Sequence, residues 1–498
     1  MQEDVFDVVV IGGGGSGLAA AIEARTHGAR VLLLEKNDDL GGSTAWSIGS
    51  ITSSQTPHQR RHGIDDNPHD HWMDMPGFAG DLAERDNHDL RRILCEEIPD
   101  TFQWLLDSGI RFMGPMPEPP HRVPRMHNVL PNSRSFIYHL SRRAQGAGVD
   151  IRTGHHLTQL IVNEGRVTGV ETRHASGMQR FVATGGVILA AGDFTSSPEF
   201  KARFMGPQQA KVEAVNVTAT GDGQRAAEAL GASILNGELA LGPEIRFMAP
   251  TTETLMRRLP PWRSLAVFMA WAIDHVPGAV LRPFIMKFLT TALAPSAALF
   301  DMGAILVNRH GVRFGNECEM PALRLPDQPD KVGYILLDQP LAQQFSAWPH
   351  FISTAPGIAY AYVDDYRRNR PDVYTQAETL EALAEKLGMD PQALRQSAQA
   401  GGVRALQVGP FVALGPVRSV YVHSEGGLQV DHHHHVVGAD GAPIVGLFAA
   451  GSTGQGGLLL KGHGHHLAWA FVSGRRAGKF AAQGLRHALR QDMNLPNN

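Results

Sequence analysis

Cysteine is scarce in this chain of 498 residues, which contains only Cys95 and Cys318. Two isolated cysteines do not form the closely spaced sets that bind structural zinc, and they provide no disulfide framework. Such low cysteine usage is typical of a reducing compartment. An apolar strand is expected to begin near residue 6, which leaves no room for a leader peptide. We therefore predict a cytoplasmic protein.

Strong charge and long apolar runs are also missing. Charged residues make up 19% of the chain and the net charge is -4, so we predict no nucleic-acid partner. The most apolar region, residues 241–300, includes the run Ser264–Ile273, which is too short to span a bilayer. We expect this region to form a buried helical pair or the wall of an apolar pocket. Peripheral membrane contact through 241–300 is the alternative.

Glycine, by contrast, is abundant, and its placement near the N-terminus is informative. An apolar run ends in a Gly-x-Gly-x-x-Gly pattern and continues directly into a helix-forming segment. These glycines allow a tight turn, close approach of a pyrophosphate and close packing of helix on strand. The diphosphate then lies at the positive end of the helix, and an acidic residue about 20 positions later binds the ribose. The predicted dinucleotide contacts are Gly12, Gly14, Gly15, Ser16, Gly17 and Glu35.

Other segments favour FAD over NAD as the dinucleotide. A second glycine turn follows Glu35 closely, and near the other end of the chain a short apolar strand ends in Gly451. Two cofactor segments separated by most of the chain suit the longer cofactor, so we predict FAD, bound non-covalently. Asp222 is expected to cap the next helix by accepting backbone N–H groups. The further predicted cofactor contacts are Lys36, Gly42, Ser43, Thr44, Gly192, Asp222, Gly451 and Ser452.

The order of these motifs resembles the superfamily of FAD-dependent fumarate reductases and 3-ketosteroid dehydrogenases, on its ketosteroid dehydrogenase side. The resemblance covers nearly the whole chain and rests on Gly41–Thr44, Thr220–Gly223, Val307–Glu317, Gly426–Leu428 and Leu447–Gly451. It implies an α/β fold in which a Rossmann-like FAD-binding domain is interrupted by a smaller α+β substrate (cap) domain. Because the chain exceeds what one core usually supports, we expect an FAD-binding domain at 1–240 and 415–498, with the cap at 241–414.

The resemblance further implies addition or removal of a C–C double bond beside a carbonyl or carboxylate. Fumarate reductases typically place an arginine where this chain has Pro321, and a second, carboxylate-binding arginine where it has Lys461. The segment Lys461–Leu467 is instead similar to the Gly-x-Gly-x-x-Leu motif of ketosteroid dehydrogenases, which assigns the ketone oxygen to the N–H of Gly464. The acid–base tyrosines of that group are absent, since Leu460 and Pro321 occupy their positions.

These departures favour α,β-desaturation of an apolar cyclic ketone, or its reverse, with an unidentified electron acceptor. A fumarate- or urocanate-type reductase of a small unsaturated acid is the alternative. A flavin-binding electron-transfer subunit, without substrate chemistry of its own, is a third interpretation.

Histidine is the expected acid–base group, because it titrates near neutral pH. His463 is the first candidate, since it lies in the motif that should touch the flavin. Tyr421 and His423 precede Gly426 and match a strand that approaches substrate in the superfamily. The predicted catalytic residues are His463, Gly464, Tyr421, His423 and Lys461, and His466 and Leu467 are predicted to contact FAD.

Four consecutive histidines, His432–His435, could suggest a metal site. Consecutive residues on a strand point to alternate faces, so these side chains are not expected to converge on one ion. No carboxylate is expected to complete such a site. We predict an exposed hairpin here and no metal.

Overall fold

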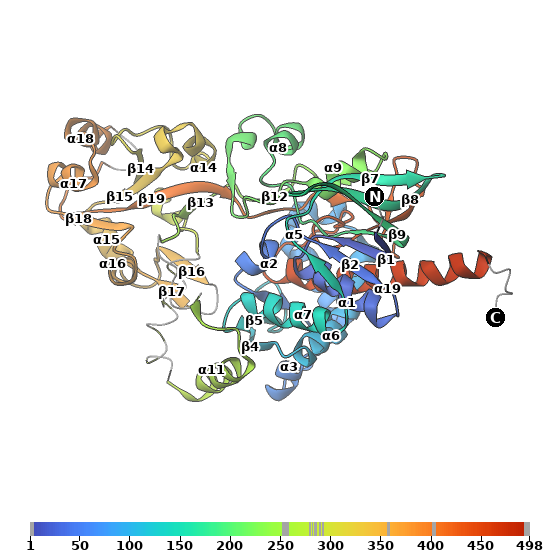
Figure 1. The fold of residues 1–498 in the computed structure, drawn as a ribbon. Coiled ribbons are helices and arrows are strands. Elements are labelled where there is room, and N and C mark those ends of the chain that lie inside the picture. The colour runs from blue at the N-terminus through green and yellow to red at the C-terminus, as the bar shows by residue number, and fades with distance from the viewer. Residues whose placement is uncertain are drawn as a thin grey trace.

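The computed structural model contains two bodies, one built around β1 and the other around β15 and β19 (Figure 1). The strand β19 (Phe411–Tyr421) is long enough to run from the second body toward the first. Both bodies combine helices with sheets, so the predicted α/β class is confirmed. The described residues are 4–250, 258–277, 280, 282, 286–287, 290, 293–355, 359–400 and 405–492.

The first body is built on an eight-stranded sheet with a parallel centre. Its main path is β22-β23-β9-β1-β2-β6; β8 pairs with β9 and β7 pairs with β8, both in antiparallel register. Val8–Ile11 and Val31–Leu34 are almost fully buried, as expected for parallel strands that are covered on both faces. The strands are β1 (Asp4–Ile11), β2 (Val31–Leu34), β6 (Asp150–Arg152), β7 (His156–Asn163), β8 (Arg166–His174), β9 (Gly177–Leu189), β22 (His435–Val437) and β23 (Pro443–Ala449).

Two helices from opposite ends of the chain pack closely beside this sheet. A Cβ added to Gly474 would lie 2.3 Å from the Ser16 carbonyl oxygen, and one on Gly478 would lie 2.2 Å from that of Ala20. The backbones of α1 and α19 therefore touch, which only glycine permits. The helices of this body are α1 (Gly15–Thr26), α2 (Gly42–Trp46), α3 (Pro57–Arg61), α4 (Pro68–Asp74), α5 (Pro76–Ala79), α6 (His88–Asp107), α7 (Arg134–Gly146), α8 (Pro198–Phe204), α9 (Asp222–Glu228) and α19 (His465–Asp492).

Short strands place several loops against the start of α19. A three-stranded sheet, β3-β5-β4, ends next to residues 463–464, where the Thr52 hydroxyl donates to the His463 carbonyl oxygen at 2.6 Å. Two small antiparallel pairs, β11–β21 and β12–β20, hold the segment around His423. These strands are β3 (Ser50–Thr52), β4 (Arg111–Met116), β5 (Met126–Leu130), β11 (Ile234–Leu235), β12 (Ala240–Leu241), β20 (His423–Ser424) and β21 (Gly427–Leu428).

The second body has a six-stranded sheet with its own apolar core. The sheet follows the order β10-β19-β15-β14, and β13 and β18 also pair with β19. Leu306, Ile335 and Leu414 are buried at its centre. Its elements are β10 (Glu213–Ala214), β13 (Glu244–Phe247), β14 (Ile305–Asn308), β15 (Gly333–Leu337), β16 (Ser353–Ala355), β17 (Ala359–Ala361), β18 (Tyr374–Ala377), α13 (Ala298–Asp301), α14 (Pro321–Arg324), α15 (Gln339–Gln344), α16 (Val363–Asn369), α17 (Leu380–Leu387) and α18 (Pro391–Gln399).

The helix α11 (Arg263–His275) corrects one prediction for residues 241–300. It packs beside β4 and β5, yet Ala266 is its only buried residue. Phe268 is 60% exposed and Trp271 is 52% exposed. The expectation of a buried helical pair or pocket wall is therefore wrong for this run, because its apolar side chains face outward. Residues 251–257 and most of 278–292 lie outside the described part of the chain. Among the described helices, none is both long enough and apolar enough to cross a membrane.

Candidate functional site: a flavin cradle beside a histidine cluster

The two glycine turns predicted to bind FAD lie against each other. Gly14 and Gly41 form an isolated parallel bridge, and the Gly41 N–H donates to the Gly13 carbonyl oxygen at 3.0 Å. A Cβ on Gly12 would lie 2.3 Å from the Ala190 carbonyl oxygen, and one on Gly17 would lie 1.8 Å from that of Gly12. No side chain fits at either position. The turn at the end of β1 is thus held against both β9 and the second glycine turn.

Charged side chains join these turns to a third segment. Buried Glu35 accepts hydrogen bonds from the Gly13 N–H at 2.7 Å and the Asn37 N–H at 2.9 Å. Lys36 Nζ donates to Thr220 Oγ1 at 2.6 Å and to Asp222 Oδ2 at 2.7 Å. The predicted cap role of Asp222 is therefore wrong: left-handed Gly221 occupies the cap position of α9, and no side chain caps that helix.

The space around the other glycines fits a bound dinucleotide. A Cβ built on Gly192 meets no atom within 4 Å, and one on Gly42 meets only the Gly14 Cα, at 3.9 Å. The side chains of Ser43 and Thr44 line the turn, where Ser43 Oγ accepts from Asn216 at 2.9 Å and Thr44 Oγ1 accepts from the Gly15 N–H at 3.1 Å. Open space bordered by glycine at the carboxyl ends of parallel strands is where α/β folds bind nucleotides.

The C-terminal cofactor segment closes the same region. The Gly451 N–H donates to Ser473 Oγ at 2.8 Å, and a Cβ on Gly451 would lie 2.7 Å from Ser16 Oγ. The Ser452 carbonyl oxygen packs so closely on Gly427 that a Cβ there would lie 2.6 Å from it. Sequence positions near 15, 43, 192 and 451 therefore converge. This chain's residues fit FAD, with the diphosphate at the start of α1.

Beyond the glycine turns, a buried carboxylate organises two of the predicted histidines. Glu425 lies immediately before Gly426, and its Oε1 is 3.3 Å from His466 Nε2 and 3.7 Å from His423 Nε2. Its Oε2 accepts from Gln455 Nε2 at 2.7 Å and from the Leu460 N–H at 3.0 Å. Burial acts to raise the pKa of Glu425, but attraction to His466 and hydrogen bonds from both histidines hold it well below its usual range. The carboxylate is thus ionised and fixed.

His423 lies directly against His466 in this group. Its ring centroid lies 3.7 Å from that of His466. Burial and the neighbouring His466 both lower the pKa of His423. The Glu425 charge therefore orients both imidazoles, and the lowered pKa favours the neutral form of His423.

His463 forms a separate pair with Glu118. The Glu118 Oε1 accepts from the His463 N–H at 2.9 Å and lies 2.5 Å from His463 Nδ1. The hydrogen bond to Glu118 raises the pKa of His463 despite partial burial. The His463 side chain is 50% exposed, so it can be reached by a small molecule. Arg246 and Glu244 on β13 lie near enough to act on His463, the first lowering its pKa and the second raising it.

The turn between His463 and α19 leaves no space for a side chain. Gly464 has a φ of 88°, and a Cβ there would lie 2.6 Å from the Thr52 nitrogen. The Ala468 N–H donates to the Gly464 carbonyl oxygen at 3.0 Å, so this glycine begins the hydrogen bonding of α19. The Lys461 carbonyl oxygen lies 2.7 Å from His465 Nδ1. Leu467 is half-buried and packs on the core of the first body.

Tyr421 lies apart from the two histidine groups. It is 2% exposed, and Lys201 Nζ lies 5.7 Å from its ring centroid. Burial raises its pKa to about 12. Among the described contacts, none joins the Tyr421 hydroxyl to His423 or His463. The phenol therefore remains a predicted catalytic group that the surrounding geometry does not support.

The consecutive histidines differ from the predicted exposed hairpin. His434 is fully buried with a φ of 66°, and its ring centroid lies 5.4 Å from that of Trp469. His435 Nδ1 lies 3.0 Å from Asp431 Oδ2, and His433 lies near the same carboxylate. The expectation that no carboxylate would join this segment is therefore wrong, because the chain reverses at residues 431–435 instead of continuing as a strand.

Several residues near the predicted site had no sequence-based prediction. Glu425 adjoins the Gly426-Gly427 motif, so its position next to predicted residues was an available signal. Glu118 lies in a proline-rich loop and Arg246 lies on β13, both far from any motif, and no pattern marks them. Their approach to His463 depends on tertiary packing alone.

Comparisons with known proteins agree with this geometry. The chain matches the FAD binding domain family over residues 7–259 and 278–459. It is 26% identical to NADH:fumarate oxidoreductase of Klebsiella pneumoniae, over 97% of this chain and 48% of that protein. It is also 26% identical to urocanate reductase of Eggerthella lenta, over 96% of this chain and 74% of that protein. It thus spans about half of the first relative and three-quarters of the second.

Solved structures share the fold. An open-conformation flavocytochrome c3 fumarate reductase superposes with a TM-score of 0.72 at 23% identity, covering 97% of this chain and 79% of that one. A 3-ketosteroid-delta4-(5alpha)-dehydrogenase of Rhodococcus jostii superposes with a TM-score of 0.59 at 22% identity, covering 97% and 98%. The predicted FAD cofactor is confirmed, and the fold is shared with a fumarate reductase and a 3-ketosteroid dehydrogenase. The chain belongs to the FAD binding domain family.

Proposed function

We propose that the protein adds hydrogen to, or removes it from, the α,β carbon–carbon bond of an apolar cyclic ketone. Bound FAD supplies hydride transfer at the β carbon. The chain's own residues must then move a proton at the α carbon and hold the carbonyl oxygen as negative charge develops. The single observation that carries the proposal is the exposed His463, whose raised pKa comes from Glu118.

His463 suits the proton transfer in the reducing direction. Because its pKa is raised, its imidazole is protonated over more of the neutral range and can donate to an enolate carbon. Glu118 fixes the ring through Nδ1, which leaves Nε2 to face the substrate. Gly464, at the start of α19, would direct a backbone N–H toward the ketone oxygen, as a helix start favours negative charge. The reductase names of the curated relatives also favour this direction.

Two features favour an apolar ketone over a dicarboxylate. Pro321 and Lys461 replace the arginines expected for carboxylate binding. Arg324, the arginine nearest to Pro321, is paired with Glu319 at 3.3 Å. A small unsaturated acid remains the second candidate, supported by the fumarate and urocanate reductases among the relatives and by Arg246 near His463. We also propose that an unidentified partner exchanges electrons with the flavin.

The test is anaerobic mixing of the FAD-loaded protein with candidate substrates while the flavin absorption is followed. Reoxidation of the reduced flavin by cyclic enones, or bleaching of the oxidised flavin by saturated ketones, is the expected result. Reoxidation by fumarate or urocanate alone would replace the ketone with the second candidate. A reduced flavin that neither the enones nor the unsaturated acids reoxidise, but that a protein partner does reoxidise, would identify an electron-transfer subunit.

We further propose that α11 contacts a membrane surface. Its exposed face carries Phe268 and Trp271, with Trp262 57% exposed at its N-terminal end. Exposed Arg258 and Arg263 lie close in sequence to these aromatic side chains. Aromatic rings on a helix, with one arginine on that helix and another just before it, suit the boundary of an anionic bilayer.

A further inference from the structure

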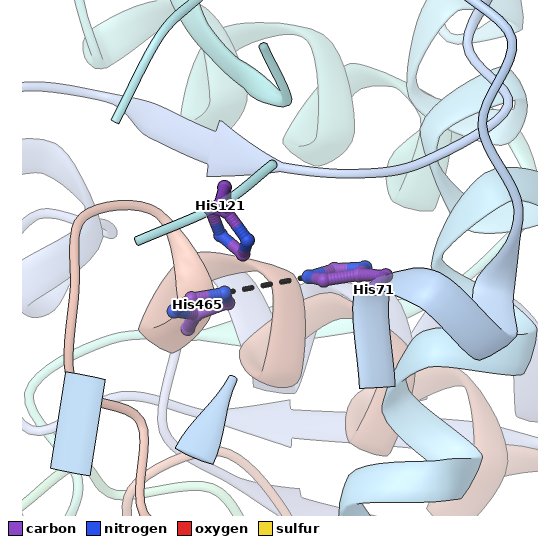
Figure 2. Close-up of side chains that lie close together, drawn as sticks. All are labelled: His71, His121 and His465. Atoms are coloured by element: carbon purple, nitrogen blue, oxygen red, sulfur yellow. Dashed lines mark hydrogen bonds between the residues drawn. The ribbon is translucent and has the colours of Figure 1, made fainter. Parts of the chain in front are cut away.

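Three histidines outside the proposed catalytic pairs meet in the interior of the first body. His71 comes from α4, His121 from the loop before β5, and His465 from the first residue of α19. Figure 2 shows the three imidazoles converging from these separate segments. All three are buried, and each offers a ring nitrogen within 4.8 Å of the other two. We propose that this cluster, His71–His121–His465, binds one Zn²⁺ or a similar divalent transition-metal ion.

The nitrogen positions fit the geometry of zinc. His71 Nε2 lies 3.4 Å from His465 Nε2. Two nitrogens bound to one tetrahedral zinc at about 2.0–2.1 Å lie roughly 3.4 Å apart, so this spacing leaves room for the ion between them. The same spacing is long for a nitrogen–nitrogen hydrogen bond. The His465 ring is already oriented, because its Nδ1 lies 2.7 Å from the Lys461 carbonyl oxygen and Nε2 is left for the metal.

An unpartnered nitrogen gives a second reason for a ligand. Among the described residues, His121 Nε2 is buried and has no hydrogen-bond partner. Buried polar atoms normally have one, since burying them without a partner is costly. A metal at the cluster would satisfy His121 Nε2 directly. A water molecule would complete the four ligands that zinc usually takes.

The charged side chains around the cluster are already paired with one another. Arg125 contacts Asp66 at 2.7 Å and Asp74 at 2.5 Å, and Asp74 also contacts Arg122 at 2.8 Å. Glu118, three residues before His121, contacts His463. The proposed ion is therefore inferred from the positions of the imidazole nitrogens.

One rearrangement accompanies binding. His121 Nδ1 now lies 2.9 Å from Arg125 Nη1, which can only donate, so the proton of the neutral ring is on Nε2. Ligation through Nε2 moves this proton to Nδ1, and the carboxylate of Asp74, 3.9 Å away, becomes its acceptor. Arg125 keeps both hydrogen bonds to Asp66. A carboxylate behind a metal-bound histidine is a common arrangement.

The test measures zinc binding, which does not depend on substrate identity. The FAD-loaded protein is stripped with a chelator, desalted and titrated with Zn²⁺ in competition with a chromophoric chelator. A His435→Gln background removes the more exposed Asp431–His433–His435 group as a second site. We expect the His435→Gln protein to bind one equivalent of Zn²⁺ tightly. Adding His71→Gln or His121→Gln should lower its affinity for Zn²⁺ at least about tenfold. Flavin content and the metal-free melting temperature check that each variant folds.

Cobalt gives an independent readout. Co²⁺ in the background variant is expected to show the visible absorption of a four-coordinate ion, at wavelengths beyond the flavin band, and His71→Gln should abolish it. If the His435→Gln protein binds no Zn²⁺ tightly, the proposal is overturned. If both double variants still bind one equivalent of Zn²⁺ tightly, the proposal is also overturned.

Discussion

Glu118 Oε1 lies 2.5 Å from His463 Nδ1 and also accepts the His463 backbone N–H. One carboxylate therefore fixes both the main chain and the ring of the residue proposed to transfer the proton. Glu118 comes from a loop far from the C-terminal motif, so the pair also fastens this loop to the start of α19. The imidazole is held with its remaining nitrogen available.

This pair predicts the pH dependence of reduction. His463 donates a proton only while protonated, so activity is present below its raised pKa and falls as the pH rises through it. Glu118→Gln removes the charge that raises this pKa, so the alkaline fall should move to lower pH. We expect roughly a tenfold lower kcat at pH 8, measured as a pH–rate profile. Glu84→Gln, at an exposed position, is the matched control; an identical profile in both variants would contradict the assignment.

Glu425 predicts a different pH effect, on stability. Its folded-state pKa lies well below the usual value, so its contribution to stability is present above about pH 4.3 and disappears as the pH falls through the folded pKa. Glu425→Gln should therefore lower the free energy of unfolding by about 3 kcal/mol at pH 7. Urea denaturation of both proteins at pH 7 and pH 3 measures this. A difference that stays constant between the two pH values would be inconsistent with an ionised Glu425.

The sequence was most informative where backbone geometry alone decides the structure. The residues at 12 and 17 must be glycine because carbonyl groups occupy the space a side chain would need, and such positions leave a pattern. Contacts between side chains leave no such sequence pattern, because Glu118 and Glu425 reach their histidines through packing between distant segments. The outward-facing α11 was mispredicted for a related reason, since an apolar helix looks the same in sequence whether its partner is a protein core or another surface.

Glycine geometry gives a prediction for cofactor binding. A Cβ on Gly17 would lie 1.8 Å from the Gly12 carbonyl oxygen, so Gly17→Ala must displace the turn that faces the diphosphate. We expect this variant to lose most of its FAD, read from the ratio of flavin to protein absorbance. Gly146→Ala, at the end of α7 where a Cβ meets no atom within 4 Å, should keep full occupancy. A fully yellow Gly17→Ala protein would show that the turn does not contact the cofactor as proposed.

The exposed face of α11 predicts binding to lipid. The protein should cosediment with anionic vesicles and less with neutral ones, because both apolar burial and the arginines contribute. Phe268→Ser together with Trp271→Ser should reduce the bound fraction about tenfold, whereas Trp348→Ser, an equally exposed aromatic on the second body, should not. Equal sedimentation of the two variants would mean that α11 is not the contact.

Lys461 offers the sharpest distinction between the two candidate substrate classes. It occupies the position expected for a carboxylate-binding arginine, so a small unsaturated acid would depend on its charge, whereas a neutral ketone would not. If the substrate is a ketone, Lys461→Met should change KM by less than about threefold, since the aliphatic part of the side chain is kept. For an acid, loss of a charged hydrogen bond worth about 1.5–3 kcal/mol should raise KM by at least tenfold. Steady-state assays of both classes with both proteins measure this difference, and a large KM increase for the better substrate would contradict the ketone proposal.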